Sequence, residues 1–288
     1  MKEEKAIPSA RKQKVKKSHM KGRFLFFLML AGLLMLVAIF AQYLCPYDPN
    51  AQNMGISLQP PSAEHLAGTD RFGRDMFSRI LVGLQTSVLA TLSLVVIITV
   101  VGTIVGILCG YFGGVTDAVI MRISDVCLAF PGLVFALAIA ALLNGGLDNA
   151  VFALAVISWP KYARIARSQT LAQKNTNYIA AAQLAGNHSL AILVKHILPN
   201  CMGPILVTSM LDIGTMLMEL AGLSFLGLGA QPPTAELGNM MSGGRSMLQT
   251  YPWVIIGPGI AIFIVVVIFN LLGDTVRDYL DPRNSRRK

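Results

Sequence analysis

Two acidic residues within an otherwise apolar run, Asp212 and Glu219, have the types and spacing most suited to binding chemistry. Their separation of seven residues places them two turns apart on one face of a helix, with the thioether of Met216 close by. Carboxylates inside an apolar segment are costly and usually face a polar cavity or a partner. These three residues are candidates to line a path for a cationic substrate. The alternative is that the carboxylates pair with cations and hydroxyls on neighbouring helices or on another subunit.

A second polar cluster is GTDRFGRDMFSR, from Gly68 to Arg79. It contains two aspartates, Asp70 and Asp75, and three arginines that include Arg74. Because each aspartate has an arginine neighbour in the sequence, the cluster favours neutralising ion pairs over a catalytic acid pair. A solvated turn is equally compatible with this spacing.

Motifs for other chemistries are absent from the sequence. It contains no G-x-x-x-x-G-K-[ST], no H-E-x-x-H and no G-x-S-x-G, so nothing predicts a phosphate cradle, a zinc protease or a nucleophile elbow. The four histidines have no metal-ligand spacing, and the four cysteines include no C-x-x-C pair. We predict that the chain is not an enzyme, binds no cofactor itself and has no certain metal site.

The composition indicates an integral membrane protein. Hydrophobic residues make up 54% of the 288 residues and charged residues only 14%, against about a quarter in soluble domains. The net charge of +9 comes from basic residues at the two ends and in the segment Lys161 to Pro199. This distribution is typical of membrane topology, so nucleic acid is not needed as a partner.

Six apolar runs are long enough to be membrane spans, which need about 20 residues each. They are Phe24 to Leu44, Ser87 to Tyr111, Ala118 to Leu143, Ala150 to Ile165, Asn200 to Leu226 and Trp253 to Leu272. The sequence therefore predicts an all-α, multi-pass membrane protein with six transmembrane helices in contact with lipid. We divide it into a tail (1–23), an anchor helix (24–44), a cap segment (45–86), a five-helix core (87–272) and a second tail (273–288).

The basic residues predict the orientation of these spans. Only four of the 24 Lys and Arg residues, Arg71, Arg74, Arg79 and Arg245, fall outside the terminal tails, the segment 161–195 and the turn near Arg122. Because cytoplasmic loops carry an excess of Lys and Arg, both termini and the loop 166–199 are expected in the cytoplasm. The proline-rich segment 45–86 is then an extracytoplasmic cap.

Within the second run, Gly102, Gly106 and Gly110 recur every fourth residue. They share one helix face and allow another backbone to approach closely. This spacing predicts a tight helix pair and indicates nothing about substrate.

The segment 180–199, AAAQLAGNHSLAILVKHILP, resembles the "EAA" loop of ABC importer permeases. The residues that carry this similarity are Ala181, Ala182, Gly186 and the closing His196, Leu198 and Pro199. Ala180 stands where the family pattern has an acidic residue, which removes one polar contact. The resemblance implies a helix pair that docks into a groove on an ATP-binding subunit.

Three further blocks look like the C-type permease of peptide and nickel importers. They are GTDRFGRDMFSR (68–79), LAGLSFLGLGAQPPTAELG (220–238) and GPGIAIFIVVVIFNLLGDTVRDYLDPR (257–283). The resemblance implies a type I ABC importer permease in a bacterial cytoplasmic membrane. Its implied partners are a homologous second permease, two ATP-binding subunits that carry ATP and Mg, and an extracytoplasmic substrate-binding protein.

The substrate suggested by the resemblance is nickel or a nickel chelate. The run Leu211 to Gly229 looks closer to nickel permeases, and carboxylates with thioethers suit a divalent cation. Di- or oligopeptides are the alternative, because a peptide amino terminus suits the same carboxylates. Two other classes, an ATP-independent carrier and an intramembrane enzyme, are disfavoured by the lack of an inverted repeat and of a nucleophile with its base.

Overall fold

The structure is a computed structural model that describes residues 10–280, and these residues form helices without any strand. The helices are α1 (Ala10–Ile39), α2 (Ala41–Leu44), η1 (Met54–Ile56), α3 (Met76–Phe112), α4 (Gly114–Ala129), α5 (Gly132–Leu142), α6 (Leu147–Lys174), α7 (Asn177–Leu184), α8 (Ser189–Ile192), η2 (Leu193–Ile197), α9 (Leu198–Phe225), α10 (Leu237–Gly244), η3 (Arg245–Met247) and α11 (Trp253–Leu280). The all-α fold predicted from the sequence is confirmed. Residues 1–9 and 281–288, which belong to the predicted tails 1–23 and 273–288, lie outside the described residues.

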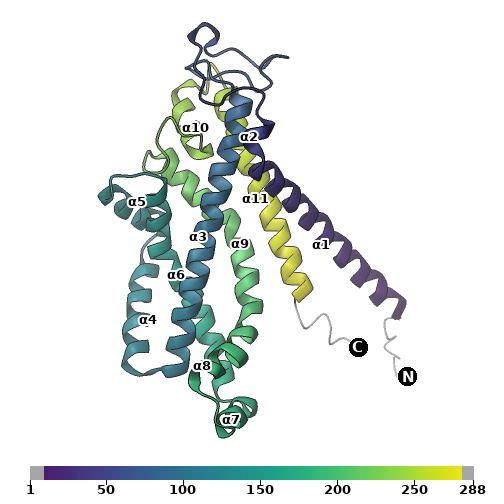
Figure 1. Ribbon diagram of the computed structural model, residues 1–288, viewed down its shortest axis with the longest axis vertical. Helices are drawn as coiled ribbons and strands as arrows, with labels where there is room; N and C mark the ends of the chain where they lie inside the picture. The colour runs from purple at the N-terminus through teal and green to yellow at the C-terminus, as the bar shows by residue number, and fades with distance from the viewer. Residues whose placement is uncertain (1–9, 281–288) are drawn as a thin grey trace, which may run out of the picture.

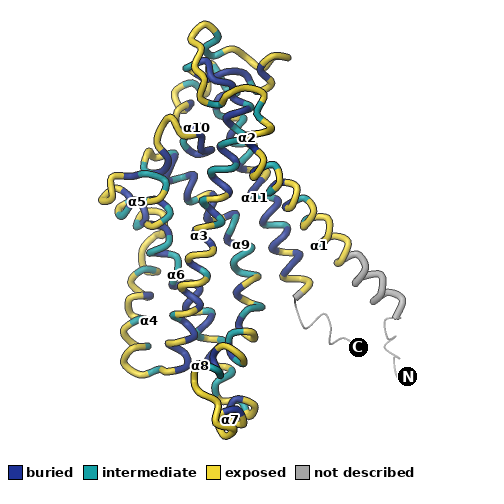
Figure 2. The backbone as a smooth tube through the Cα atoms, viewed as in Figure 1, coloured by how far each residue is buried: buried dark blue, intermediate teal, exposed yellow. Residues whose placement is uncertain are grey.

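The long helices run roughly along one axis of the molecule. In Figure 1, α3, α6 and α9 extend between two ends, one formed by α7 and α8 and the other by α10 and the segment between α2 and α3. Helix α1 leans away from the other helices (Figure 1), and most of the α1 residues from 21 onward are exposed (Figure 2). It meets α11 through Ala31 and Leu34, and Phe24 stacks on Tyr279 with 5.4 Å between ring centroids.

Four helical segments of the described chain are long and apolar enough to cross a membrane, or five when a bent helix pair counts as one. They are Lys21–Ile39, Met76–Phe112, Ser189–Phe225 and Trp253–Tyr279, and the bent pair is α4 with α5. Helix α6 is less apolar because its second half carries basic residues such as Lys161 and Arg164. The count of six spans therefore stays a prediction.

The predicted third span, Ala118 to Leu143, is wrong as a single helix. Helices α4 and α5 meet at an angle of 98° across Phe130 and Pro131. Proline has no N–H for the helical ladder and disfavours helical backbone at the preceding residue, and Phe130 is extended with ψ 150°. The chain bends there because of this proline.

Four other predicted boundaries also shift because helices continue into segments expected to be irregular. Helix α3 begins at Met76, inside the predicted cap, where the Asp75 carboxylate accepts a hydrogen bond from the Ser78 N–H at 2.7 Å. Helix α6 continues to Lys174, so the first part of the predicted loop 166–199 is helical. Helices α1 and α11 likewise extend into the predicted tails.

The glycine stripe of α3 packs against α6, as its spacing predicts. A Cβ at Gly102 would lie 2.5 Å from the Trp159 carbonyl oxygen, and one at Gly106 would lie 2.2 Å from the Ala163 carbonyl oxygen. At Gly110 it would lie 2.8 Å from the Thr170 Cβ. No real Cβ tolerates such distances, so the two backbones are in direct contact over two turns.

Replacing Gly106 by Ala should therefore separate α3 from α6 and lower the melting temperature of the purified protein by several degrees. We expect a cost of roughly 1–3 kcal/mol, typical of overpacking. The matched control is Gly32→Ala in α1, where a Cβ meets nothing within 4 Å. Equal melting temperatures for the two variants would contradict the packing argument.

Candidate functional site

A short helical hairpin, α7 with α8, projects from the end of the molecule where α6 leads into α9 (Figure 1). The chain reverses between the two helices at Gly186, whose φ of +80° suits glycine. The side chain of Asn187 closes α7 by donating a hydrogen bond to the Ala182 carbonyl at 3.0 Å. The local sequence thus specifies two short helices with a turn between them.

This hairpin has a buried side and an exposed apolar side. Ile179, Ala182 and Ile192 are buried against the rest of the chain. Leu184 is 90% exposed and Leu190 is 72% exposed. Unpaired apolar side chains of this size indicate a surface that another protein covers.

The residues predicted from the resemblance are distributed over both sides. Ala180, Ala181 and Gly186 are exposed, and no atom lies within 4 Å of a Cβ built at Gly186. The glycine is required here by its positive φ, while the surrounding space is open. Ala182 instead belongs to the buried side.

The segment His196 to Pro199 joins the hairpin to α9. Residues Leu193–Ile197 form a π-helical turn, in which the Leu198 N–H bonds to the Leu193 carbonyl. Pro199 follows, and it has no N–H to continue the ladder. Helices α8, η2 and α9 form one continuous path, so a displacement of the hairpin can be transmitted directly to α9.

The basic residues Lys161, Arg164 and Arg167 of the segment Lys161 to Pro199 are engaged in ion pairs within the chain. They lie on α6 and pair with aspartates of other helices. Arg167 binds Asp117 of α4 through two contacts of 2.6 Å, and Arg164 binds Asp125 of α4 at 2.5 Å. The sequence near them contains no acidic residue, so only the fold reveals these pairs.

The third pair involves Asp212, one of the predicted path residues. Its carboxylate accepts hydrogen bonds from the Lys161 ammonium at 2.6 Å and from the Tyr162 hydroxyl at 2.9 Å. Asp212 is 4% exposed and Met216 is 6% exposed, the latter within the main hydrophobic core. Glu219 is partly exposed and has no hydrogen bond or ion pair among the described residues. Asp212 and Met216 are therefore held by contacts within the chain, whereas the Glu219 carboxylate is partly exposed.

The cap residues are paired as well, but not as the sequence suggested. Asp70 binds Arg74 with an Nε to Oδ2 distance of 2.7 Å, as expected. Asp75 has no arginine partner among the described residues; it contacts the His65 ring nitrogen at 2.9 Å and caps α3. Sequence proximity to Arg74 and Arg79 was misleading, because the turn at Gly73 directs both arginines toward Asp70.

Glu236 is a buried residue that the sequence analysis did not identify. Its side chain is fully buried and accepts hydrogen bonds from Ser87 Oγ at 2.8 Å, the Gly238 N–H at 3.1 Å and the Asn239 N–H at 2.8 Å. It caps α10 and ties that helix to α3. A glutamate directly before a short glycine-containing helix was the available signal, and its partner Ser87 lies far away in the sequence.

Comparison with known proteins assigns the chain to a family. Residues 102–286 match the model of the binding-protein-dependent transport system inner membrane component. Residues 23–61 match the N-terminal transmembrane domain of oligopeptide transport permease C. The chain belongs to the family of binding-protein-dependent transport system inner membrane components. It is therefore a multi-pass bacterial inner membrane permease subunit of an ABC importer, in a family where separate subunits hydrolyse ATP. This membership rules out the ATP-independent carrier, which was the alternative transporter class.

Several relatives are similar over most of the permease. The chain is 45% identical to the probable D,D-dipeptide transport system permease protein of Escherichia coli K12, covering 87% of this chain and 84% of the relative. It is 41% identical to the dipeptide transport system permease protein of Haemophilus influenzae, covering 86% of each. It is 44% identical to the glutathione transport system permease protein of Pectobacterium atrosepticum, covering 87% of this chain and 84% of the relative.

The fold is similar to that of a chain in the MetNI methionine ABC transporter, solved in inward-facing conformations. The TM-score is 0.57 and the identity 19%, covering 72% of this chain and 98% of that chain. The ABC importer permease fold predicted from the sequence is thus confirmed.

Replacing Lys161 by Gln in this permease should lower the free energy of unfolding by roughly 1–3 kcal/mol. Asp212 would remain buried without its cation, and the loss is moderated because the Lys161 side chain is half exposed. The double variant with Asp212→Asn should lose less than the sum of the single variants, as thermal unfolding of the purified protein would show.

The matched control is Arg122→Gln, whose side chain is 88% exposed and 3.9 Å from Asp125. It should change the unfolding free energy by under about 1 kcal/mol. Strict additivity in the Lys161 and Asp212 cycle would contradict a coupled pair.

Proposed function

We propose that this chain is one of two permease subunits of an ATP-driven importer of di- or oligopeptides. A homologous permease completes the translocation path, and an extracytoplasmic binding protein delivers the substrate. Two ATP-binding subunits dock on the cytoplasmic side and carry ATP and Mg. The apolar faces of the long helices contact lipid.

The exposed apolar side of the α7–α8 hairpin carries this proposal. The hairpin lies at one end of the molecule (Figure 1). The side chains of Leu184 and Leu190 in this hairpin are 90% and 72% exposed. Ala180 and Ala181 beside them are small, which permits close approach of another subunit. Together with Gly186, His196, Leu198 and Pro199, they form the proposed coupling surface. On this assignment the α7 end and both termini face the cytoplasm.

The connections of the hairpin support a mechanical role. Helix α6 precedes the hairpin in the chain and α9 follows it. The ion pair between Lys161 and Asp212 links these two helices. Arg167 links α6 to α4 through Asp117. When ATP draws the two ATP-binding subunits together, the hairpins of both permeases move with them. The attached helices then tilt between inward-facing and outward-facing arrangements, which requires ATP to bind one arrangement better.

The relatives support peptide as the substrate in place of nickel. Those described above are named for dipeptides and glutathione, and nickel finds no support among them. The described residues also contain no group of three or more His, Cys, Asp or Glu able to hold a metal. Of the three candidate path residues, Glu219 is the one with free acceptor atoms, and we assign it to the peptide ammonium group. Asp212 and Met216 are assigned to packing and pairing of α9, the helix that carries Glu219.

Replacing Leu184 by Ser should weaken docking of the ATP-binding subunits and reduce peptide uptake at least tenfold. The matched control is Leu66→Ser, because Leu66 is 62% exposed in the cap at the opposite end. Copurification of the ATP-binding subunits and uptake in proteoliposomes provide the measurement. Unchanged copurification of the Leu184 variant would contradict the coupling surface.

The substrate is tested with the reconstituted complex of both permeases, ATP-binding subunits and binding protein. We expect ATP hydrolysis to be stimulated severalfold by a dipeptide and to be unchanged by nickel or a nickel chelate. Glu219→Gln should reduce uptake of the dipeptide while the complex remains assembled. Stimulation by nickel alone would reverse the substrate assignment.

A further inference from the structure

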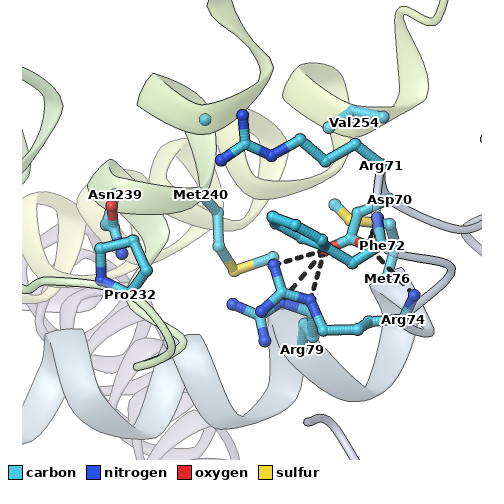
Figure 3. A pocket seen from close by; sticks show the side chains of 11 residues that line it. Asp70, Arg71, Phe72, Arg74, Met76, Arg79, Pro232, Asn239, Met240 and Val254 are labelled. Atoms are coloured by element: carbon cyan, nitrogen blue, oxygen red, sulfur yellow. Dashed lines mark hydrogen bonds and ion pairs between the residues drawn. The ribbon is translucent and has the colours of Figure 1, made fainter. Parts of the chain in front are cut away.

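A pocket lined by three arginines opens at the end of the molecule opposite the α7–α8 hairpin. Figure 3 shows its walls, which come from the loop before α3, the first turn of α3, α10 and the start of α11. Segments far apart in the sequence meet here, since Arg71 and Arg79 line the pocket together with Asn239 and Val254. The site is separate from the coupling surface and from Glu219.

The pocket carries an excess of positive charge. Three arginines line it, Arg71, Arg74 and Arg79, against a single carboxylate, Asp70. Arg74 and Arg79 both approach Asp70, at 2.7 and 3.8 Å, and Arg79 also donates to the Pro49 carbonyl at 2.9 Å. One carboxylate cannot neutralise three guanidinium groups, so the pocket has a net charge of +2.

Arg71 is the arginine whose charge is available. It is exposed, and its guanidinium has no carboxylate partner among the described residues. Its Cζ lies 4.7 Å from the centre of the Phe72 ring, and the Cζ of Arg74 lies at the same distance from that ring. A guanidinium held over an aromatic ring is oriented and keeps its N–H donors free for a carboxylate.

The loop that holds Arg71 is rigid. The Asp70 carboxylate accepts hydrogen bonds from the N–H groups of Phe72 and Arg74, at 2.8 and 3.0 Å. Gly73 has a φ of +69°, and a Cβ there would lie 1.8 Å from the Asn53 carbonyl oxygen. A charged group fixed in this way loses little conformational entropy when a ligand binds.

We infer that this pocket is the docking socket for an acidic side chain of the extracytoplasmic substrate-binding protein. The inference rests on the proposed function, which supplies that protein as a partner on this side. An Asp or Glu of the binding protein pairs with Arg71 at the mouth of the pocket, between Phe72 and α10. Complementary charge at such a contact accelerates association and sets orientation.

The carboxylate is assigned to the binding protein and not to the peptide for a structural reason. The pocket lies in the cap, formed by the loop before α3 and the ends of helices, whereas Glu219 lies within α9. A docking protein meets the cap first. On the proposed function the peptide then passes between the two permeases to Glu219, which does not line this pocket.

The test uses the complete transporter in lipid nanodiscs and its purified binding protein, with affinity measured by biolayer interferometry. Arg71→Glu should weaken binding at least tenfold at low salt and reduce the salt dependence of the affinity. Arg245→Glu is the matched control, because it makes the same charge change at an exposed arginine of η3 that does not line the pocket. It should remain within twofold of the original protein. Basal ATP hydrolysis should be equal in all three complexes.

Charge reversal on the binding protein completes the test. One Asp or Glu to Arg variant of the binding protein should restore its affinity for the Arg71→Glu complex. An affinity of that complex within twofold of the original would overturn the inference. So would failure of the Arg71→Glu chain to copurify with its partner permease, which would place Arg71 in the contact between permeases.

Two further outcomes separate the possible sources of failure. If Arg71→Glu weakens only the peptide-loaded binding protein and not the empty one, the carboxylate belongs to the peptide and the inference is wrong. If the binding protein fails to stimulate ATP hydrolysis even in the original complex, the proposed function itself fails. If the binding protein stimulates ATP hydrolysis by the original complex and binds the Arg71→Glu complex equally well, the inference about Arg71 fails and the proposed function stands.

Discussion

The backbone contact between α3 and α6 is the constraint on which the other helices depend. In a bilayer, apolar surface gives little driving force for helix association, so close packing and polar pairing must hold helices together. At Gly102 and Gly106 the absence of side chains lets α3 touch the carbonyl oxygens of Trp159 and Ala163. This contact fixes the rotation of α6 and thereby directs its remaining faces toward α4 and α9.

Once α6 is fixed, its basic residues can be satisfied only by acids on particular helices. Arg164 and Arg167 bind two aspartates of α4, and Lys161 binds Asp212 of α9. Removing Lys161 would leave the buried Asp212 carboxylate without its cation. The ion pairs join α6 to α4 and to α9, and α6 and α9 flank the α7–α8 hairpin.

The two ends of the molecule present different surfaces. The α7–α8 hairpin exposes apolar groups such as Leu184, whereas the cap presents a rigid cationic pocket around Arg71. Glu236, buried between α3 and α10, holds the outer helices in register with the long ones. A subunit that must bind different proteins on the two sides of a membrane requires this difference in chemistry.

The sequence by itself determined what depends on composition and short-range pattern. Apolar run length predicted the membrane class, the four-residue glycine spacing predicted a close helix pair, and motif resemblance predicted the family and the hairpin around Gly186. It did not identify which distant residues pair with one another. Lys161 and Asp212 are 51 residues apart, and Ser87 and Glu236 are 149 residues apart, so their pairing exists only once the helices are packed.

Pro131 was visible in the sequence, but whether it would bend a span or be tolerated, as Pro160 is in α6, depends on the packing around it. The tertiary structure decided these points because the free-energy cost of an unpaired charge, or of a carbonyl without a hydrogen bond, depends on which helix packs beside it.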